Sequence, residues 1–124
     1  MSSEPARPLD IPARVGRAVA AMLDKKGLEL RVLHLERVTE VTDYFLICSA
    51  GNPRQIEAIG DGVRESLRQG EGVRPLHIEG KGGGHWLLLD YGDFVVHVFD
   101  EQTRAFYDLE RLWSDAPDVT GEFC

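Results

Sequence analysis

Asp90 and Asp93 are the carboxylates whose setting most resembles an active site, because they lie between two apolar runs, residues 86–89 and 94–99. A two-metal site for nucleotidyl transfer typically needs carboxylates two residues apart on one strand, since side chains at that spacing share a face of the sheet. These two aspartates lie three residues apart and straddle a turn, Asp90-Tyr91-Gly92-Asp93. The spacing therefore favours the solvated tip of a hairpin over a metal site.

A glycine-rich segment with one lysine, residues 79–84, resembles a phosphate-binding loop. Such a loop needs a serine or threonine after the lysine and a helix whose first N–H groups face the phosphate. Here Gly82 follows Lys81, and the next apolar run begins at Trp86 with the pattern of a strand. A flexible loop that lets this strand begin is therefore favoured, with Lys81 kept as a candidate contact to a partner.

Serine and histidine side chains that could act in catalysis lack the partners that catalysis needs. Ser49 follows an apolar run, where a hydrolase nucleophile would lie, but Ile47 stands where the G-x-S-x-G motif has its first glycine. His77, His85 and His97 do not have the helical spacing of a metal-binding pair, and ordinary hydrogen-bonded histidines are favoured. The sequence therefore predicts no catalytic residue, no metal ligand and no cofactor.

The elements that would position these side chains follow from hydrophobic spacing and from helix-start and helix-stop residues. Apolar residues recur at helical spacing from Asp10 to Gly27 and from Asn52 to Gly70, and a last helix is expected within residues 103–113. Strands are predicted at residues 28–38, 44–48, 75–79, 86–89 and 94–99. The run 44–48 does not alternate, which is typical of a central strand covered on both faces.

This order of elements predicts an α/β (α+β) fold in which helices flank a mixed β-sheet, because strands that follow one another directly cannot all be parallel. Residues 11–113 are predicted to form the domain. Residues 1–10 are predicted to be a flexible N-terminal arm and residues 114–124 a flexible C-terminal tail, because neither has periodic apolar residues. Neither end is expected to carry the fold.

Length and composition fit one domain of ordinary hydrophobicity, with 124 residues of which 43% are hydrophobic. No apolar run approaches the roughly 20 residues that cross a bilayer, and the polar start resembles neither a secretory signal nor a transit peptide. A cytoplasmic protein without membrane contact is the expectation. Cys48 and Cys124 form no closely spaced motif, and Cys48 is expected to pack in the core.

The net charge of −7 is confined to the last third of the chain. Basic and acidic side chains balance in residues 1–89, whereas residues 90–124 hold nine acidic side chains against Arg104 and Arg111. An acidic surface repels the phosphates of nucleic acid and attracts a basic protein. We therefore expect no direct nucleic-acid binding and, if there is a partner, a basic protein; charge alone favours a solvated face that aids solubility.

Several segments together resemble the ribosomal silencing factor (Iojap-like) family. The most specific is residues 85–99, in which a strand led by Trp86, the Asp-aromatic-Gly-Asp turn and a Val-His strand follow one another. Agreement extends over residues 42–45, 47–50, 52–55 and 104–113, so the likeness runs from about residue 11 to residue 113. One departure from the family's pattern is the run of glycines at residues 82–84. This run lies in the loop that holds Lys81.

The resemblance implies a nucleotidyltransferase-like fold that lacks the catalytic carboxylates, and a protein that is not an enzyme. Family members bind ribosomal protein L-fourteen on the large ribosomal subunit and block docking of the small subunit, which lowers translation when nutrients run short. Several are homodimers in isolation. The partner-binding residues predicted on this basis are Lys81, Trp86, Leu88, Asp90, Tyr91 and Asp93.

Two alternatives stay open from the residues themselves. Leucines at 87, 88 and 89 make both faces of their strand apolar, so the pattern does not decide whether Trp86 lies in the core or at an interface. The alternative function is a metal-dependent nucleotidyltransferase-like enzyme, in which Asp90 and Asp93 would keep a catalytic role.

Overall fold

The computed structural model describes residues 10–124, so nearly all of the predicted N-terminal arm lies outside the described residues. The helices and strands follow one another in the order α1 (Ile11–Asp24), β1 (Leu28–His34), β2 (Tyr44–Ala50), α2 (Pro53–Glu71), β3 (His77–Glu79), β4 (Trp86–Asp90), β5 (Phe94–Asp100), α3 (Glu101–Tyr107) and α4 (Leu109–Leu112). A short 3-10 turn, η1 (Thr120–Glu122), follows. Within residues 10–124 no helix is both long enough and apolar enough to span a membrane.

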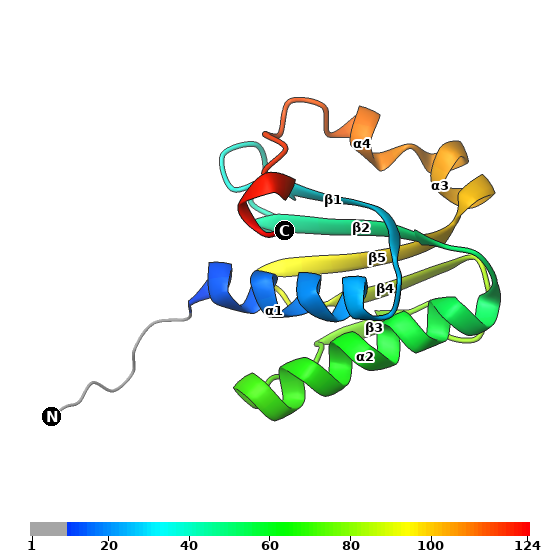
Figure 1. The fold of residues 1–124 in the computed structure, drawn as a ribbon. Helices are drawn as coiled ribbons and strands as arrows, with labels where there is room; N and C mark the ends of the chain where they lie inside the picture. The colour runs from blue at the N-terminus through cyan, green and yellow to red at the C-terminus, as the bar shows by residue number, and fades with distance from the viewer. Residues whose placement is uncertain (1–9) are drawn as a thin grey trace, which may run out of the picture.

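The five strands form one mixed sheet in the order β1-β2-β5-β4-β3. The pair β2 and β5 is parallel, and the other pairs are antiparallel. Helices α1 and α2 pack against one face of the sheet, and the short helices α3 and α4 lie on the other side (Figure 1). The predicted mixed sheet flanked by helices is therefore confirmed.

Both long helices begin at the residues that the sequence marks as helix starts. The Asp10 carboxylate accepts a hydrogen bond from the Ala13 backbone N–H at 3.1 Å, and the Asn52 side chain accepts one from the Gln55 N–H at 2.8 Å. Each bond satisfies one of the backbone donors that a helix leaves free in its first turn. A proline follows each cap, where its missing N–H costs nothing. Helix α2 ends at Gly72, whose φ of 67° suits the left-handed conformation.

The centre of the molecule is the parallel pair β2 and β5. Six of the seven residues of each strand are buried, as expected for strands covered on both faces. The main core lies between the sheet and helices α1 and α2, and a smaller apolar cluster lies under α3 and α4. The Cys48 side chain is fully buried, which confirms its predicted place in the core, and burial raises the pKa of its thiol to about 12.

The last predicted helix is two helices, α3 and α4, which meet at Asp108. The backbone of Asp108 has a φ of 47°, a left-handed conformation that breaks the helical hydrogen bonding and that aspartate tolerates better than most residues. The break changes which side chains face the sheet. Leu109 is buried, whereas Phe106 and Leu112 are 80% and 70% exposed.

Residues 114–124 differ from the flexible tail expected for them, because they lie along the outer edge of β1. The Val119 N–H donates to the Val32 carbonyl at 2.8 Å, and the His34 N–H donates to the Pro117 carbonyl at 2.9 Å. The Phe123 ring packs edge-on against Tyr44 with a centroid distance of 6.0 Å. The segment thus covers an exposed sheet edge, which periodicity alone does not reveal. A domain boundary at residue 113 stays a prediction.

Deletion of residues 115–124 should lower the free energy of unfolding by about 2–4 kcal/mol, because it removes two backbone hydrogen bonds and the apolar contact of Phe123. Urea denaturation of the full chain and the shortened chain measures the difference. Phe123→Ala alone is expected to give about half of the loss, since the hydrogen bonds remain. A shortened chain as stable as the full chain would restore the original expectation that this segment adds little.

Candidate partner-binding face

Trp86, Leu88 and Asp90 alternate along β4 and lie on the face of the sheet opposite α1 and α2, which we call the open face. The intervening Leu87 and Leu89 point into the main core, where Leu87 packs against Gly60 of α2. Trp86, Leu88 and Asp90 are each half-buried, because α3 and α4 cover only part of this face. Alternation along a strand therefore brings three of the six predicted contact residues together.

Trp86 has both a packing role and an accessible surface. Its indole Nε1 donates a hydrogen bond to Nδ1 of His97 at 3.1 Å, and its ring packs on Phe99 and Tyr107 with centroid distances of 4.8 and 4.7 Å. The side chain remains half-buried. The sequence left open whether Trp86 lies in the core or at an interface. The structure combines both positions, because one side of the ring packs on the smaller apolar cluster and the rest stays accessible.

His97 holds Trp86 in place from the neighbouring strand. Its side chain is almost fully buried, and its ring also contacts Phe45 at a centroid distance of 4.6 Å. Burial lowers the pKa of His97 from its usual value near 6.5 to about 3, so the ring is neutral near pH 7 and Nδ1 is free to accept the indole hydrogen. This confirms the expectation of a hydrogen-bonded histidine at this position.

Acid should destabilise the protein through His97, because this side chain binds a proton near pH 6.5 in the unfolded chain but only near pH 3 in the folded chain. The free energy of unfolding that neutral His97 contributes is fully present above its unfolded pKa near 6.5, and it is lost as the pH falls below that value. Between pH 7.5 and pH 5 the expected loss from this group is about 2 kcal/mol. Urea denaturation at a series of pH values measures it.

The matched control is His97→Gln, whose side-chain oxygen can still accept the indole hydrogen of Trp86 but does not titrate. Its free energy of unfolding should vary much less over the same pH range, whatever its value at neutral pH. Equal slopes for the two proteins between pH 7.5 and pH 5 would show that His97 is not the group responsible.

Tyr91 does not lie on the open face. It is 7% exposed, belongs to the main core and stacks on Phe94 with a centroid distance of 4.9 Å. Burial raises the pKa of Tyr91 to about 12, against a smaller opposite effect of Arg64. The structure thus gives this residue, predicted as a contact to a partner, a packing position behind the hairpin turn.

Asp90 and Asp93 shape the turn between β4 and β5. The Asp90 carboxylate accepts a hydrogen bond from the Gly92 N–H at 2.8 Å, and Gly92 has a φ of 87° that favours glycine. The Asp93 carbonyl accepts from the Asp43 N–H at 3.0 Å, which ties the turn to the start of β2. Both side chains are half-buried. Their arrangement is that of a hairpin tip, as the spacing predicts.

Lys81 is exposed at the opposite end of β4, in the turn between β3 and β4. Gly80 begins this turn with a φ of 79°, and a Cβ there would lie 1.9 Å from the Trp86 carbonyl oxygen. The Gly82 N–H donates to the Glu57 carboxylate at 2.9 Å. The glycines therefore form a tight connection into a strand, and Lys81 lies apart from Asp90 and Asp93.

The exposed surface next to Trp86 was not anticipated from the sequence. Phe106, Tyr107 and Leu112, which we call the α3–α4 patch, are 80%, 49% and 70% exposed. Tyr107 joins this patch to the open face through its contact with Trp86. The break at Asp108 divides the single helix expected within residues 103–113, and these side chains lie exposed on either side of it.

Acidic side chains accompany the patch on α3 and α4 and at the residues that join and follow these helices. They are Glu101, Asp108 and Glu110, and Asp115 follows α4. Large exposed apolar side chains are typical of a surface that binds another protein, and the charged side chains around this patch are mostly acidic, with Arg111 as an exposed basic side chain on α4. The open face and the α3–α4 patch together therefore form a continuous candidate interface for a basic partner.

Ser49 is held in a structural network rather than beside a histidine and a carboxylate. The Arg104 guanidinium donates to the Ser49 hydroxyl at 2.9 Å, to the Glu29 carbonyl at 2.8 Å and to the Glu110 carboxylate at 2.7 Å. Within the part of the chain that the structure describes, no group of three or more His, Cys, Asp or Glu side chains could hold a metal ion. Arg104 thus links β1, β2, α3 and α4.

The fold and the surface together define the class of protein. It is a small mixed α/β domain with an aromatic and acidic face suited to binding another protein. A family model described as "Ribosomal silencing factor during starvation" matches residues 8–123. Since the match spans nearly the whole chain, the chain belongs to the ribosomal silencing factor family. The family's name describes regulation of the ribosome, which is a regulatory rather than a catalytic role.

Curated relatives agree with this assignment. The ribosomal silencing factor of Bacillus subtilis is 39% identical over 100 residues, which cover 81% of this chain and 84% of that protein. The chloroplast protein Iojap of Zea mays is 35% identical over 97 residues, which cover 76% of this chain and 40% of that longer protein. The similarity thus extends over most of this chain and over less than half of the chloroplast protein.

A solved structure confirms the fold. The crystal structure of a protein from Chromobacterium violaceum superposes with a TM-score of 0.82 at 31% sequence identity, covering 86% of this chain and 88% of that chain. A second crystal structure, of a protein from Bacillus halodurans, gives a TM-score of 0.77 at 34% identity and covers 87% of this chain and 97% of that chain. This chain therefore shares its fold with these proteins over most of its length.

Proposed function

We propose that this protein binds the large ribosomal subunit through ribosomal protein L-fourteen and blocks association with the small subunit, which represses translation under nutrient limitation. The observation that carries the proposal is the α3–α4 patch beside Trp86, on a member of the ribosomal silencing factor family. No catalytic step is part of it. A bound domain of 124 residues acts by occupying space that the small subunit needs.

The proposed contact surface combines aromatic anchors with charge. Trp86, Leu88 and the α3–α4 patch supply apolar area, since buried aromatic side chains contribute most to many protein interfaces. Asp90 and Asp93 add negative charge at the hairpin tip, and acidic side chains on α3 and α4 add more. Complementary charge speeds encounter with a basic protein and fixes its orientation. Lys81, at the other end of β4, would contact the rim.

A homodimer of the free chain is the second part of the proposal and follows from the family resemblance. A second copy would cover exposed apolar side chains such as Phe106 and Leu112 until the chain binds the large ribosomal subunit. Light scattering of the free chain over a range of concentrations measures its mass. If Phe106→Asp, which introduces a charge on the patch, leaves a dimer intact, the patch is not the dimer contact.

Co-sedimentation with purified large subunits tests the proposed partner. The chain should travel with large subunits without added nucleotide or divalent metal beyond what the subunits need to stay folded, and it should not travel with small subunits. Metal-dependent nucleotide turnover, lost when Asp90 or Asp93 is changed to asparagine, would instead support the enzyme alternative. Absence of the chain from the large-subunit fraction would rule out the proposed function.

A further inference from the structure

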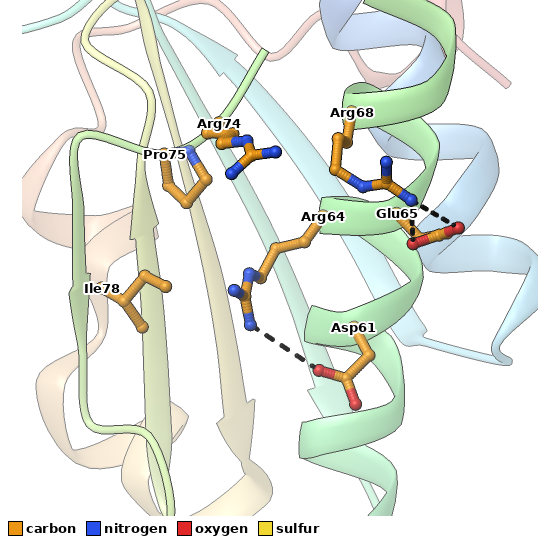
Figure 2. Close-up of a pocket in the computed structure, with 7 residues that line it drawn as sticks. All are labelled: Asp61, Arg64, Glu65, Arg68, Arg74, Pro75 and Ile78. Carbon is orange, nitrogen blue, oxygen red and sulfur yellow. Dashed lines mark hydrogen bonds and ion pairs between the residues drawn. The ribbon is translucent and has the colours of Figure 1, made fainter. Parts of the chain in front are cut away.

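A second surface feature lies on the other side of the molecule, in a groove between α2 and β3 (Figure 2). Its volume is about 420 Å³. Three arginines dominate its lining, together with two acidic side chains and two apolar ones: Arg64, Arg68, Arg74, Asp61, Glu65, Pro75 and Ile78. Neither the open face nor the α3–α4 patch includes any of these residues.

Two of the arginines enter this groove from different elements, Arg64 from α2 and Arg74 from the loop that leads to β3 (Figure 2). Arg64 extends from α2 toward β3, and Arg74 extends from the connecting loop toward α2, whereas Arg68 turns toward Glu65 on α2 (Figure 2). Like charges that line one groove repel, so an anion bound in the groove would be stabilised by both. A guanidinium group offers several N–H donors in a plane that matches two phosphate oxygens.

The counterions already present hold these arginines loosely. Arg64 has one ion pair, to the 69% exposed carboxylate of Asp61 at 3.9 Å, near the limit of such a contact. Within residues 10–124 no carboxylate forms an ion pair with Arg74. Exposed pairs of this kind contribute little free energy, so exchange of Asp61 for an incoming anion costs little.

The groove is separated from one part of the acidic third of the chain, residues 114–124, whereas Asp90 pairs with His77 of β3 beside the groove. The groove lies beside β3 at one edge of the sheet, whereas residues 114–124 lie along β1 at the opposite edge. Charges separated by more than about 8–10 Å in physiological salt are largely screened from one another. The total charge of −7 therefore does not decide what binds at this edge.

We propose that this arginine groove binds phosphate groups of ribosomal RNA beside the protein partner. The proposal rests on the proposed function, because it is the large subunit that would bring RNA to the groove. RNA phosphate is the most abundant anion on a ribosomal subunit and repeats along the backbone, so that Arg64 and Arg74 can each contact a phosphate. The proposal departs from the expectation, based on total charge, that nucleic acid makes no direct contact, and the tests below decide between the two.

The first test compares full-length chains in binding to purified large subunits at several salt concentrations. The double variant Arg64→Glu/Arg74→Glu should weaken binding about tenfold or more and make the salt dependence shallower by about one to two units in log–log slope. The control Lys26→Glu/Arg37→Glu changes charge equally at exposed sites outside the groove. The proposal is overturned if the groove variant and the control differ by less than twofold.

A second arm identifies the anion. Protein-free RNA from the large subunit should bind the wild-type chain and bind the groove variant at least fivefold more weakly. If the groove variant loses subunit affinity but RNA binding is unaffected, and polyglutamate competes with the subunit, the occupant is an acidic protein and RNA is excluded. Arg64→Gln/Arg74→Gln gives a milder change should the double glutamate variant melt at a lower temperature.

The two arms also separate this inference from the proposed function. If the wild-type chain does not bind large subunits, the proposed function is contradicted. The experiment with protein-free RNA then still decides whether the groove binds phosphate. A wild-type chain that binds subunits, together with a groove variant that binds as the control does, overturns the groove alone.

Discussion

Replacing Arg104 with alanine should lower the free energy of unfolding by about 3 kcal/mol, a large part of the stability of a domain this small. Arg104 is 8% exposed, and its guanidinium connects β1 and β2 with both C-terminal helices, which lie far from these strands in sequence. Its removal leaves the Ser49 hydroxyl and the Glu29 carbonyl without their donor. Glu110 is 31% exposed, so water recovers part of its interaction, and the expected loss lies at the lower end for a buried pair.

Arg111→Ala is the matched control, because Arg111 is exposed on α4 and its loss should change stability by less than about 0.5 kcal/mol. Arg104→Lys keeps the charge but not the planar group, and should fall between alanine and the wild type. Urea denaturation of the four proteins measures the series. If Arg104→Ala is as stable as Arg111→Ala, the network does not hold β1 to the helices.

Replacing Trp86 with alanine should weaken binding to the large subunit by at least about 2 kcal/mol, the loss typical of an aromatic anchor. Because the indole also packs on Phe99 and donates to His97, the same change should lower the free energy of unfolding by about 2–3 kcal/mol. Binding and unfolding must therefore be measured on the same sample, below the melting temperature of the variant.

Phe106→Asp separates binding from stability. At 80% exposure the side chain contributes little to folding, so melting should stay within about 0.5 kcal/mol of the wild type while binding falls about tenfold or more. Val41→Asp, at 78% exposure in the loop between β1 and β2, is the control and should affect neither property. Equal binding by Phe106→Asp and Val41→Asp would remove the α3–α4 patch from the interface.

Much of the fold follows from local patterns. The caps Asp10 and Asn52 and the continuous apolar strand at residues 44–48 predict elements that the structure confirms. These signals are local, because a cap or an alternation involves residues within one or two turns of each other. The packing of residues 114–124 on β1 was missed, since it depends on Val119 and Val32 meeting across the chain.

The candidate site was less predictable than the fold. Alternation groups Trp86, Leu88 and Asp90 correctly once the buried face of β4 is known. Because residues 86–89 are apolar on both faces, the sequence does not predict which face is buried. Tyr91 follows β4 at the turn, where alternation no longer applies, and its ring turns into the core. The exposure of Phe106 and Leu112 was also missed, since the break between α3 and α4 at Asp108 has no signal in helical spacing.

A subunit-joining assay tests the central claim most directly. Large and small subunits are mixed at a magnesium concentration that favours joining, with the wild-type chain or Phe106→Asp in excess over large subunits, and light scattering records the joined particle. The wild-type chain should keep most subunits apart, and the variant should do so only at about tenfold higher concentration. If subunits join at the same rate and to the same extent with and without the folded wild-type chain, the protein is not a block to subunit association.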